Sequence, residues 1–341
     1  FRISEPKVMK SVIKRNIKTG EEVFNGNSEE IETTQETQIY NKKHSLLMSL
    51  AREFVWLLGK WKTKELNKFL DEYDTDVLFF PVYSNVYMNR LQNYIRKYTN
   101  KPVVLYVSDD NYSYKSIAKT PLSYFSRFWL RSQEKKLFKN ASKIMVIAPK
   151  QKEEYDRLFN TDSVILTKGI DFSTIPYEEK PLNKPVKMVY TGKLIIGRWL
   201  SLAKIAEALG EINKDATKVE LDIYTTDSLT EEQKIKLNRN GCSVKGALTL
   251  DEVQAVQKQA DILVFVESLE KEFRYTARLS FSTKITDYLK SGKCIFAVGD
   301  KDIAPIDYFN RYDSAVTATS YDEIGLKLKE LINNKEKMEL N

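Results

Sequence analysis

Residues 186–192 read VKMVYTG, a short apolar run that ends in a glycine and precedes a helical pattern over residues 200–213. The same alternation continues to residue 299. Its further predicted strands are VELDIYT (219–225), SVKGALT (243–249), DILVFVE (261–267) and CIFAVG (294–299), and the helices between them are predicted at 230–240, 250–259 and about 283–290. Strands and helices that alternate in this way predict a parallel sheet with helices on both faces.

The first half of the chain repeats this architecture. Its apolar runs are DVLFFPVYS (76–84), PVVLYVSDD (102–110), SKIMVIAP (142–149) and SVILTKGID (163–171), with predicted helices at 60–73 and 124–140. A first strand with a glycine-rich loop is not recognisable. The α/β fold class is therefore two doubly wound, Rossmann-like domains.

Proline and charge break every period around residues 173–185, which predicts the interdomain linker. The expected domains are then 1–172 and 186–320. In the final segment, 321–341, Ile324, Leu328 and Leu331 recur at helical spacing. We expect this helix to pack back toward the first domain.

Composition excludes several classes of protein. The 341 residues are 42% hydrophobic and 30% charged, as in globular proteins, and the net charge of +7 comes from 54 bases interspersed among 47 acids. Cys242 and Cys294 have no metal-type spacing and are expected as buried thiols, while His44 is the one histidine and has no triad motif around it. No apolar run is long enough to span a membrane, and FRISEPKVMK lacks the core of a signal peptide, so a cytoplasmic protein is expected.

One candidate phosphate site follows the strand at 186–192. Ligands bind beyond the carboxyl ends of parallel strands, where a glycine lets the backbone approach them. Gly192 holds that position, and Lys193 and Arg198 supply cations in the next loop. The alternative is a glycine turn with solvated bases.

A second candidate lies at the start of the helix predicted at 283–290. Ser282 or Thr283 is a suitable N-cap, and Lys284 in the first turn opposes the helix dipole unless an anion binds there. Asp287, one turn on, can accept hydrogen bonds from ribose hydroxyls. The alternatives are a solvated Lys284 and an ion pair of Asp287 with Lys284 or Lys290.

A third strand end carries adjacent carboxylates. Asp109 and Asp110 lie in VSDDNYSY (107–114), among tyrosines that can pack on sugar rings. A carboxylate there can receive the proton of an acceptor hydroxyl, which makes both residues catalytic candidates. A helix N-cap with a solvated turn is the alternative for one of them.

The stretch STKITDYLKSGKCIFAVG (282–299) resembles the signature of retaining GT-B glycosyltransferases of the glycogen-synthase-like and mannosyltransferase group, also described as family 4-like. The resemblance covers roughly residues 186–299. It implies two Rossmann-like domains facing each other across a cleft, with the donor bound by the second. It also implies that Gly192 approaches the donor phosphates, that a basic pair, here Lys193 and Arg198, binds the diphosphate, and that Asp287 contacts the ribose.

The chain departs from that family in three places. Leu279 stands where the family often has a glutamate near the sugar, and Glu267, Glu270 and Glu272 are nearby replacements. The family usually has an arginine followed five residues later by a lysine, whereas here Lys193 precedes Arg198. The family's Asn-Gly-Ile-Asp appears as residues 168–171, KGID, which keeps the turn but changes its first side chain.

The resemblance implies a glycosyltransferase that moves a sugar from a nucleoside-diphosphate sugar to a hydroxyl of a saccharide or lipid-linked acceptor. Retention of configuration, no metal or other cofactor, and a UDP-sugar in preference to a GDP-sugar are the accompanying expectations. A non-catalytic partner subunit of the same fold is the alternative, since the glutamate is missing. A nucleic-acid partner is not expected because the bases are spread along the chain, and no Gly-x-Gly-x-x-Gly supports an NAD-dependent oxidoreductase.

Basic residues of the first half raise a further hypothesis, peripheral docking on an anionic inner membrane leaflet that carries a lipid-linked acceptor. The bases are Lys60, Lys62, Lys64, Arg90, Arg96, Lys97 and Lys101. A solvated charged face is the alternative.

Overall fold

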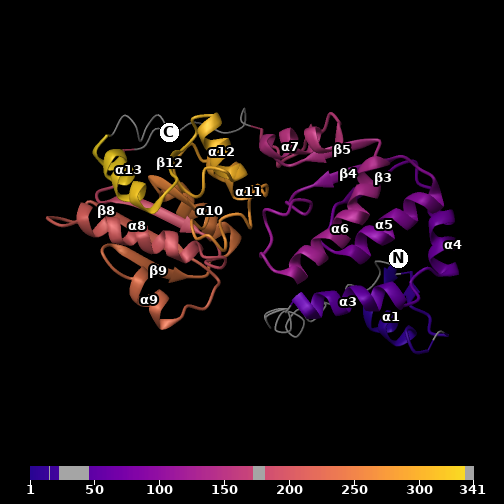
Figure 1. Ribbon diagram of the computed structural model, residues 1–341. Helices are drawn as coiled ribbons and strands as arrows, with labels where there is room; N and C mark the ends of the chain where they lie inside the picture. The colour runs from indigo at the N-terminus through magenta and orange to yellow at the C-terminus, as the bar shows by residue number, and fades with distance from the viewer. Residues whose placement is uncertain (15, 23–45, 172–180, 335–341) are drawn as a thin grey trace. The chain divides into compact units, whose positions relative to one another are not determined.

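The computed structural model describes residues 1–14, 16–22, 46–171 and 181–334, and these form two compact units (Figure 1). Unit 1 contains Phe1–Val107, Asn111–Met145 and Phe159–Val164. Unit 2 contains Ser108–Asp110, Val146–Leu158 and Ile165–Asn341. Two short stretches of the first half of the sequence therefore belong by their contacts to the second unit.

Unit 2 is built on a six-stranded parallel sheet. The strands are β7 (Val186–Thr191), β8 (Val219–Tyr224), β9 (Cys242–Gly246), β10 (Ile262–Val266), β11 (Cys294–Val298) and β12 (Val316–Ala318). Their spatial order is β12-β11-β10-β7-β8-β9, and each strand pairs in parallel with its neighbours. Counted from β7, this is the doubly wound order 3-2-1-4-5-6, whose direction reverses between β7 and β10.

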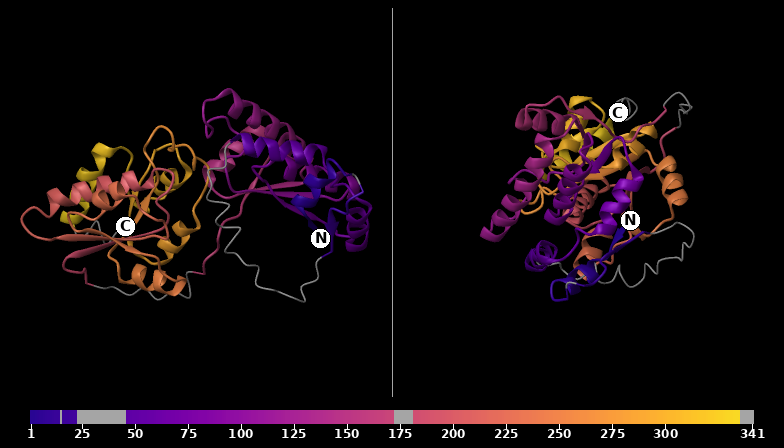
Figure 2. Two further views of the ribbon diagram at one scale, coloured as in Figure 1. Left: turned by 90° about the horizontal axis from the view of Figure 1, so that it is seen from below. Right: turned by 90° about the vertical axis from the view of Figure 1, so that its right-hand side faces the viewer.

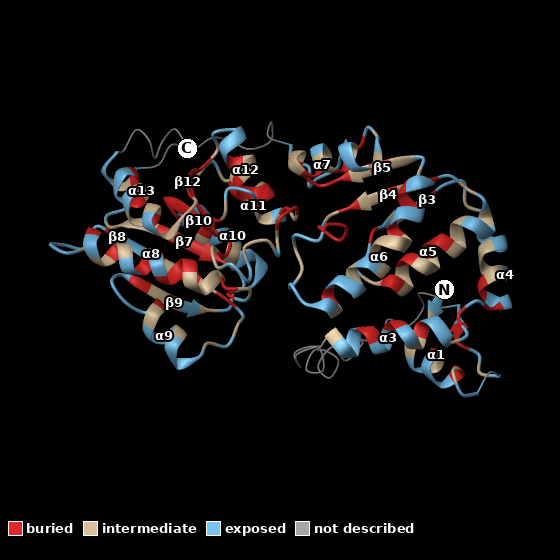
Figure 3. Ribbon diagram, viewed as in Figure 1, coloured by how far each residue is buried: buried red, intermediate tan, exposed pale blue. Residues whose placement is uncertain are grey.

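Alternate residues of these strands enter two cores on opposite faces. In β10, Ile262, Val264 and Val266 join one core, and Leu263 and Phe265 join the other. Because both faces are covered, the central strand β10 and its neighbour β11 are apolar and buried throughout, and Figure 3 shows buried residues along β10.

The helices of unit 2 follow the strands and cover both faces (Figure 2). Helices α8 and α13 contribute to the first core, and α11 and α12 to the second. The helices are α8 (Arg198–Ile212), α9 (Glu231–Leu237), α10 (Leu250–Gln259), α11 (Thr283–Lys290), α12 (Ala304–Arg311) and α13 (Tyr321–Asn333). Thr230 and Thr249 begin α9 and α10 with capping boxes, which explains why these two starts are sharp.

The apolar stripe of the last helix is buried, as predicted. Ile324, Leu328 and Leu331 pack into the core of unit 2, beside α8 and β12. That this segment also packs back toward the first domain stays a prediction. The rest of segment 321–341 lies outside the described residues.

Unit 1 is built on a four-stranded sheet. Its strands have the order β3-β4-β5-β6, and the last of them, β6, is two residues long. The strands are β3 (Leu78–Pro81), β4 (Val103–Val107), β5 (Lys143–Val146) and β6 (Val164–Ile165). The antiparallel strands β1 (Arg2–Ile3) and β2 (Gly20–Glu21) pair separately. The helices of the first half are α1 (Glu5–Ser11), α3 (Leu46–Leu58), α4 (Lys64–Tyr73), α5 (Val86–Thr99), α6 (Pro121–Lys139) and α7 (Pro149–Phe159).

Most predicted elements are confirmed with small shifts in their ends. The strand predicted at 163–171 is shorter. The elements that were not predicted are α1, α3, α5, α7, α12, β1, β2 and β12. Cys242 and Cys294 are free and buried, as expected. The first part of the predicted linker, 173–180, and His44 lie outside the described residues. Among the described helices, none combines the length and apolarity needed to cross a bilayer.

Candidate functional site

The predicted donor residues gather in unit 2 where the strand order reverses. Strands β7 and β10 are neighbours there, and each continues into a loop that leads to a helix, α8 and α11 respectively. Both helices present their amino ends at the carboxyl edge of the sheet. In open α/β sheets this crevice is where ligands bind, and helix starts favour anions.

Lys284 lies directly over the end of β7. Its Nζ donates to the Thr191 main-chain oxygen at 3.1 Å, and a Cβ built on Gly192 would lie 2.4 Å from that Nζ. A side chain at position 192 would therefore displace the ammonium of Lys284. Burial, and then the charge of Arg198, lower the pKa of Lys284 to about 8, while Glu267 acts in the opposite direction.

Arg198 and Glu267 form a bidentate ion pair at the same place. Arg198 Nη2 and Nε donate to the two Glu267 oxygens at 2.8 and 3.0 Å, and the Glu267 side chain is 8% exposed. Gly197 has φ +72°, and a Cβ there would lie 2.5 Å from Ser268 Oγ. A glycine thus brings the start of α8 against the loop after β10.

The first turn of α11 agrees with the predicted cap. Ser282 Oγ accepts from the Lys284 N–H at 3.4 Å, and Thr283 is exposed. Asp287 is hydrogen-bonded to Lys168 Nζ, from the KGID turn. The alternative pairing of Asp287 with Lys284 or Lys290 is not what the structure has; its partner is Lys168, 119 positions away in the sequence.

Lys193 is placed less centrally than Arg198 and Lys284. Its side chain is exposed, and its main-chain oxygen accepts from Tyr190 Oη at 2.7 Å. Leu279, at the place of the family's glutamate, is fully buried. Glu267 is the carboxylate that the structure brings next to the two cations.

Asp109 and Asp110, both in unit 2, have different surroundings. Arg278 donates to Asp110 at 2.8 Å, and the Asp110 side chain is only 1% exposed. Asp109 is exposed and accepts from Ser280 Oγ at 2.6 Å. Of the two catalytic candidates, the geometry leaves Asp109 accessible and gives Asp110 a structural ion pair.

Arg278 also binds Glu154 of α7, at 2.6 and 2.8 Å. Sequence reasoning missed this arginine and its second partner. A base inside the apolar stretch before α11 was the available signal, since a buried charge requires a partner. The ion pairs fasten Ser108–Asp110 and α7 to the loop that leads into α11.

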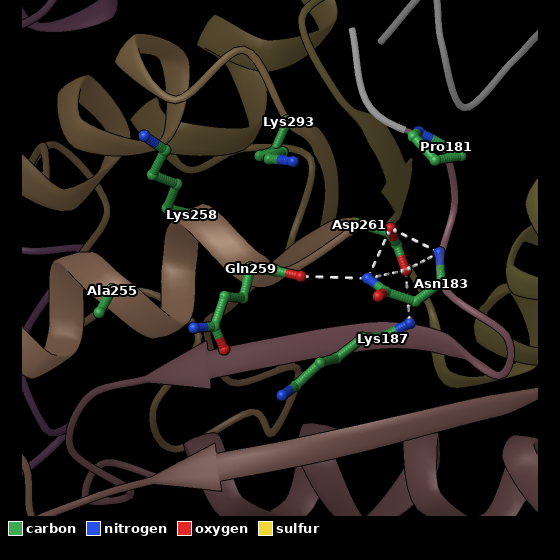
Figure 4. A pocket seen from close by; sticks show the side chains of 8 residues that line it. All are labelled: Pro181, Asn183, Lys187, Ala255, Lys258, Gln259, Asp261 and Lys293. Atoms are coloured by element: carbon green, nitrogen blue, oxygen red, sulfur yellow. Dashed lines mark hydrogen bonds between the residues drawn. The ribbon is translucent and has the colours of Figure 1, made fainter. Parts of the chain in front are cut away.

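A pocket of about 560 Å³ lies at the opposite, amino edge of the same sheet (Figure 4). Lys187, Lys258 and Lys293 line it, and the Asp261 carboxylate accepts from the Asn183 main-chain and side-chain nitrogens. None of the predicted site residues lines this pocket. Within the ranges that the structure describes, no cluster of three or more His, Cys, Asp or Glu residues could hold a metal ion.

No family model and no curated protein matches this chain. Solved structures do match it. The lipopolysaccharide glycosyltransferase WaaG has a TM-score of 0.53 and 12% identity, over 85% of this chain and 89% of that one. The outer core galactosyltransferase WaaB has 0.52 and 13%, over 84% and 72%.

TarM matches with a TM-score of 0.52 and 13% identity over 80% of this chain, which spans 52% of TarM. At such identities these likenesses show the fold alone. The chain therefore has the two-domain, Rossmann-like GT-B fold that was expected from residues 282–299.

Proposed function

We propose that this protein is a glycosyltransferase that moves a sugar from a nucleoside-diphosphate sugar to a hydroxyl of a saccharide or lipid-linked acceptor. The observation that carries the proposal is the position of Lys284 Nζ against the main chain of Thr191 and Gly192, where the strand order of unit 2 reverses, with the charge of Arg198 close enough to lower its pKa. Two cations and two helix starts at one strand edge match the charge of a diphosphate. The GT-B fold supports sugar transfer as the reaction.

Each residue has a role in this proposal. Lys284 and Arg198 stabilise the negative charge that develops on the leaving diphosphate, and the main chain at Gly192 approaches its oxygens. Ser282 and Thr283 lie at the start of α11, which also stabilises the charge of the diphosphate. Asp287 exchanges Lys168 for the ribose hydroxyls when the donor binds.

Glu267 holds Arg198 in place through two hydrogen bonds, so it is a positioning residue for the cation. Asp109 is the accessible carboxylate for the acceptor hydroxyl, and Ser280 orients it. Asp110, fastened by Arg278, fixes the segment that carries Asp109.

The choice of nucleotide, the stereochemistry of transfer, the absence of a metal or other cofactor and the role of Lys193 are also part of the proposal. A UDP-sugar is preferred because the solved structure of the pneumococcal GtfA, which has a similar fold with a TM-score of 0.51 and 15% identity, contains UDP and GlcNAc. Transfer with retention and without a metal ion or other cofactor follows from the resemblance of residues 282–299. Lys193, in an exposed position, completes the expected set of donor residues.

Calorimetric titration of UDP, GDP and ADP and of their sugar conjugates tests the proposal. We expect one nucleotide to bind selectively, and Lys284→Ala and Asp287→Ala to weaken it about tenfold or more. Lys290→Ala, an exposed lysine on the last turn of α11, is the matched control and should leave the affinity unchanged. If no nucleotide binds, the proposal is wrong, and the non-catalytic alternative gains support.

A further inference from the structure

Two helices of unit 1 present apolar side chains to solvent. On α3, Leu47, Phe54 and Leu58 share one face and are 66%, 46% and 67% exposed. On α6, Tyr124, Phe125 and Phe128 are exposed, with Phe128 at 65%. These six residues are called the α3–α6 surface below.

The two helices form one surface because they contact each other through aromatic rings. The ring centroids of Phe54 on α3 and Trp129 on α6 are 5.4 Å apart, and Phe125 lies 6.2 Å from the same tryptophan. Tyr114, in the loop before α6, stacks on Tyr124 at 5.7 Å. Exposed apolar patches of this kind mark interaction sites rather than ordinary protein surface.

The charges around this surface have one sign. Residues 111–133 contain four bases, Lys115, Lys119, Arg127 and Arg131, and no acid. The Arg131 guanidinium lies 4.6 Å from the centroid of the Tyr114 ring, so positive charge is located beside the aromatic side chains. Glu53, the acid on α3, is buried and accepts from the main chain at the start of α5.

We propose that the α3–α6 surface docks the protein on an anionic lipid bilayer, with its apolar side chains at the acyl boundary and the bases of 111–133 at the lipid phosphates. Aromatic and leucine side chains beside lysine and arginine are the composition of interfacial helices. Single-stranded nucleic acid fits less well, because Leu47 and Leu58 offer no ring on which a base can stack.

This surface differs from the bases that the sequence offered for docking. Several of those bases have other contacts: Lys101 pairs with Asp74 at 3.2 Å, and Arg90 donates to the Trp56 main-chain oxygen at 3.3 Å. Lys62 lies over the rings of Trp61 and Tyr94. The bases offered by the sequence include no apolar side chain, whereas the α3–α6 surface consists of them.

Flotation of the full chain with vesicles tests the docking. We expect binding to vesicles that contain phosphatidylglycerol and little binding to pure phosphatidylcholine. The double change Phe125→Ser and Phe128→Ser should weaken binding at least about tenfold, because two exposed rings no longer leave water. Lys115→Gln with Lys119→Gln should weaken it about fivefold for each base and reduce its salt dependence.

Controls separate docking from unfolding. Ile235→Ser, at a 71% exposed position on α9 of unit 2, and Lys64→Gln on α4 should leave vesicle binding unchanged. All variants should keep the wild-type thermal unfolding and nucleotide titration, since none lies at the donor residues. Docking can therefore fail while the proposed enzymatic function stands, and the reverse.

A second measurement locates the contact. Brominated lipids quench tryptophan at the acyl boundary, so we expect quenching in the wild type that Trp129→Phe removes. Equal binding to neutral and anionic vesicles, full binding of the Phe125/Phe128 variant, or no vesicle binding would each overturn the proposal. Self-association that the same two changes abolish, or oligonucleotide binding that displaces vesicles, would assign the surface to another partner and overturn it as well.

Discussion

The ammonium of Lys284 makes donor binding depend on pH. Its pKa of about 8 reflects burial and the neighbouring Arg198 charge, and a bound diphosphate favours the charged form. We therefore expect nucleotide affinity to fall as the pH rises above about 8, by up to about tenfold per pH unit. Titrations from pH 6.5 to 9.5 in buffers of different ionisation enthalpy would show the affinity change and the proton uptake.

Lys284→Arg is the matched variant, since arginine stays charged throughout this range. Its affinity should be flat with pH, and a slope equal to that of the wild type would place the titrating group elsewhere.

The folding stability contributed by Lys284 changes with pH in the direction opposite to the nucleotide affinity. Between about 8 and 10.5 the unfolded chain binds more protons at this lysine, so folding stability from this group rises with pH.

Glu267 influences the same titration. Its negative charge raises the pKa of Lys284, so Glu267→Gln should lower that pKa and shift the fall in nucleotide affinity to a lower pH. The loss of the charged partner of Arg198 should also lower the free energy of unfolding by about 1–3 kcal/mol. Glu270→Gln, in the same loop, is the control, and a similar pH shift in that variant would contradict the assignment.

Sequence alone could group Gly192, Arg198 and Lys284, because strand ends and helix starts are local patterns that the parallel fold brings together. It could not give the partners of Asp287 and Asp110. Lys168 and Arg278 are separated from them by 119 and 168 positions, and such pairs depend on how loops pass one another. Glu267 was one of three candidates until its geometry with Arg198 was known.

Helix α7 provides a comparison of two ion pairs on one element. Glu154 binds the buried Arg278, whereas the adjacent Glu153 binds Arg311, whose side chain is 36% exposed. Arg278→Leu removes the guanidinium that pairs with the buried Asp110 and should cost about 3–5 kcal/mol. Arg311→Leu should cost less than about 1 kcal/mol.

Urea unfolding followed by amide exchange in β10 and β11 would measure both changes in the unit concerned. Equal costs would show that the Arg278 network is effectively solvated.

The elements themselves were largely predictable, since β10 and β11 are apolar runs of five residues and the apolar residues of β8 alternate with polar ones. The three-residue β12 was not, because a short edge strand carries little periodic pattern.

The division of the whole molecule follows contacts rather than sequence order. The sequence predicts a first domain of residues 1–172, but Ser108–Asp110 and Val146–Leu158 group with unit 2. Ion pairs of Arg278 and Arg311 and burial of Ile147 and Ala148 in a core of unit 2 account for this grouping. Composition and periodicity do not reveal such exchanges, since they depend on contacts made after the chain has folded.

A fragment of residues 181–334 tests this division. It keeps strands β7 to β12 but lacks Asp110, Glu154 and the apolar Ile147 and Ala148. We expect it to be less stable than unit 2 in the full chain. Without the covering segments the Arg278 guanidinium is hydrated, so Arg278→Leu should cost less than about 1 kcal/mol in the fragment, against several in the full chain. Urea unfolding of the full chain and of the fragment, each with and without Arg278→Leu, measures the difference between the two costs. An equal cost in both backgrounds would mean that Arg278 acts within its own loop, and that the segments around Asp110 and Glu154 are not fastened to unit 2 by this side chain.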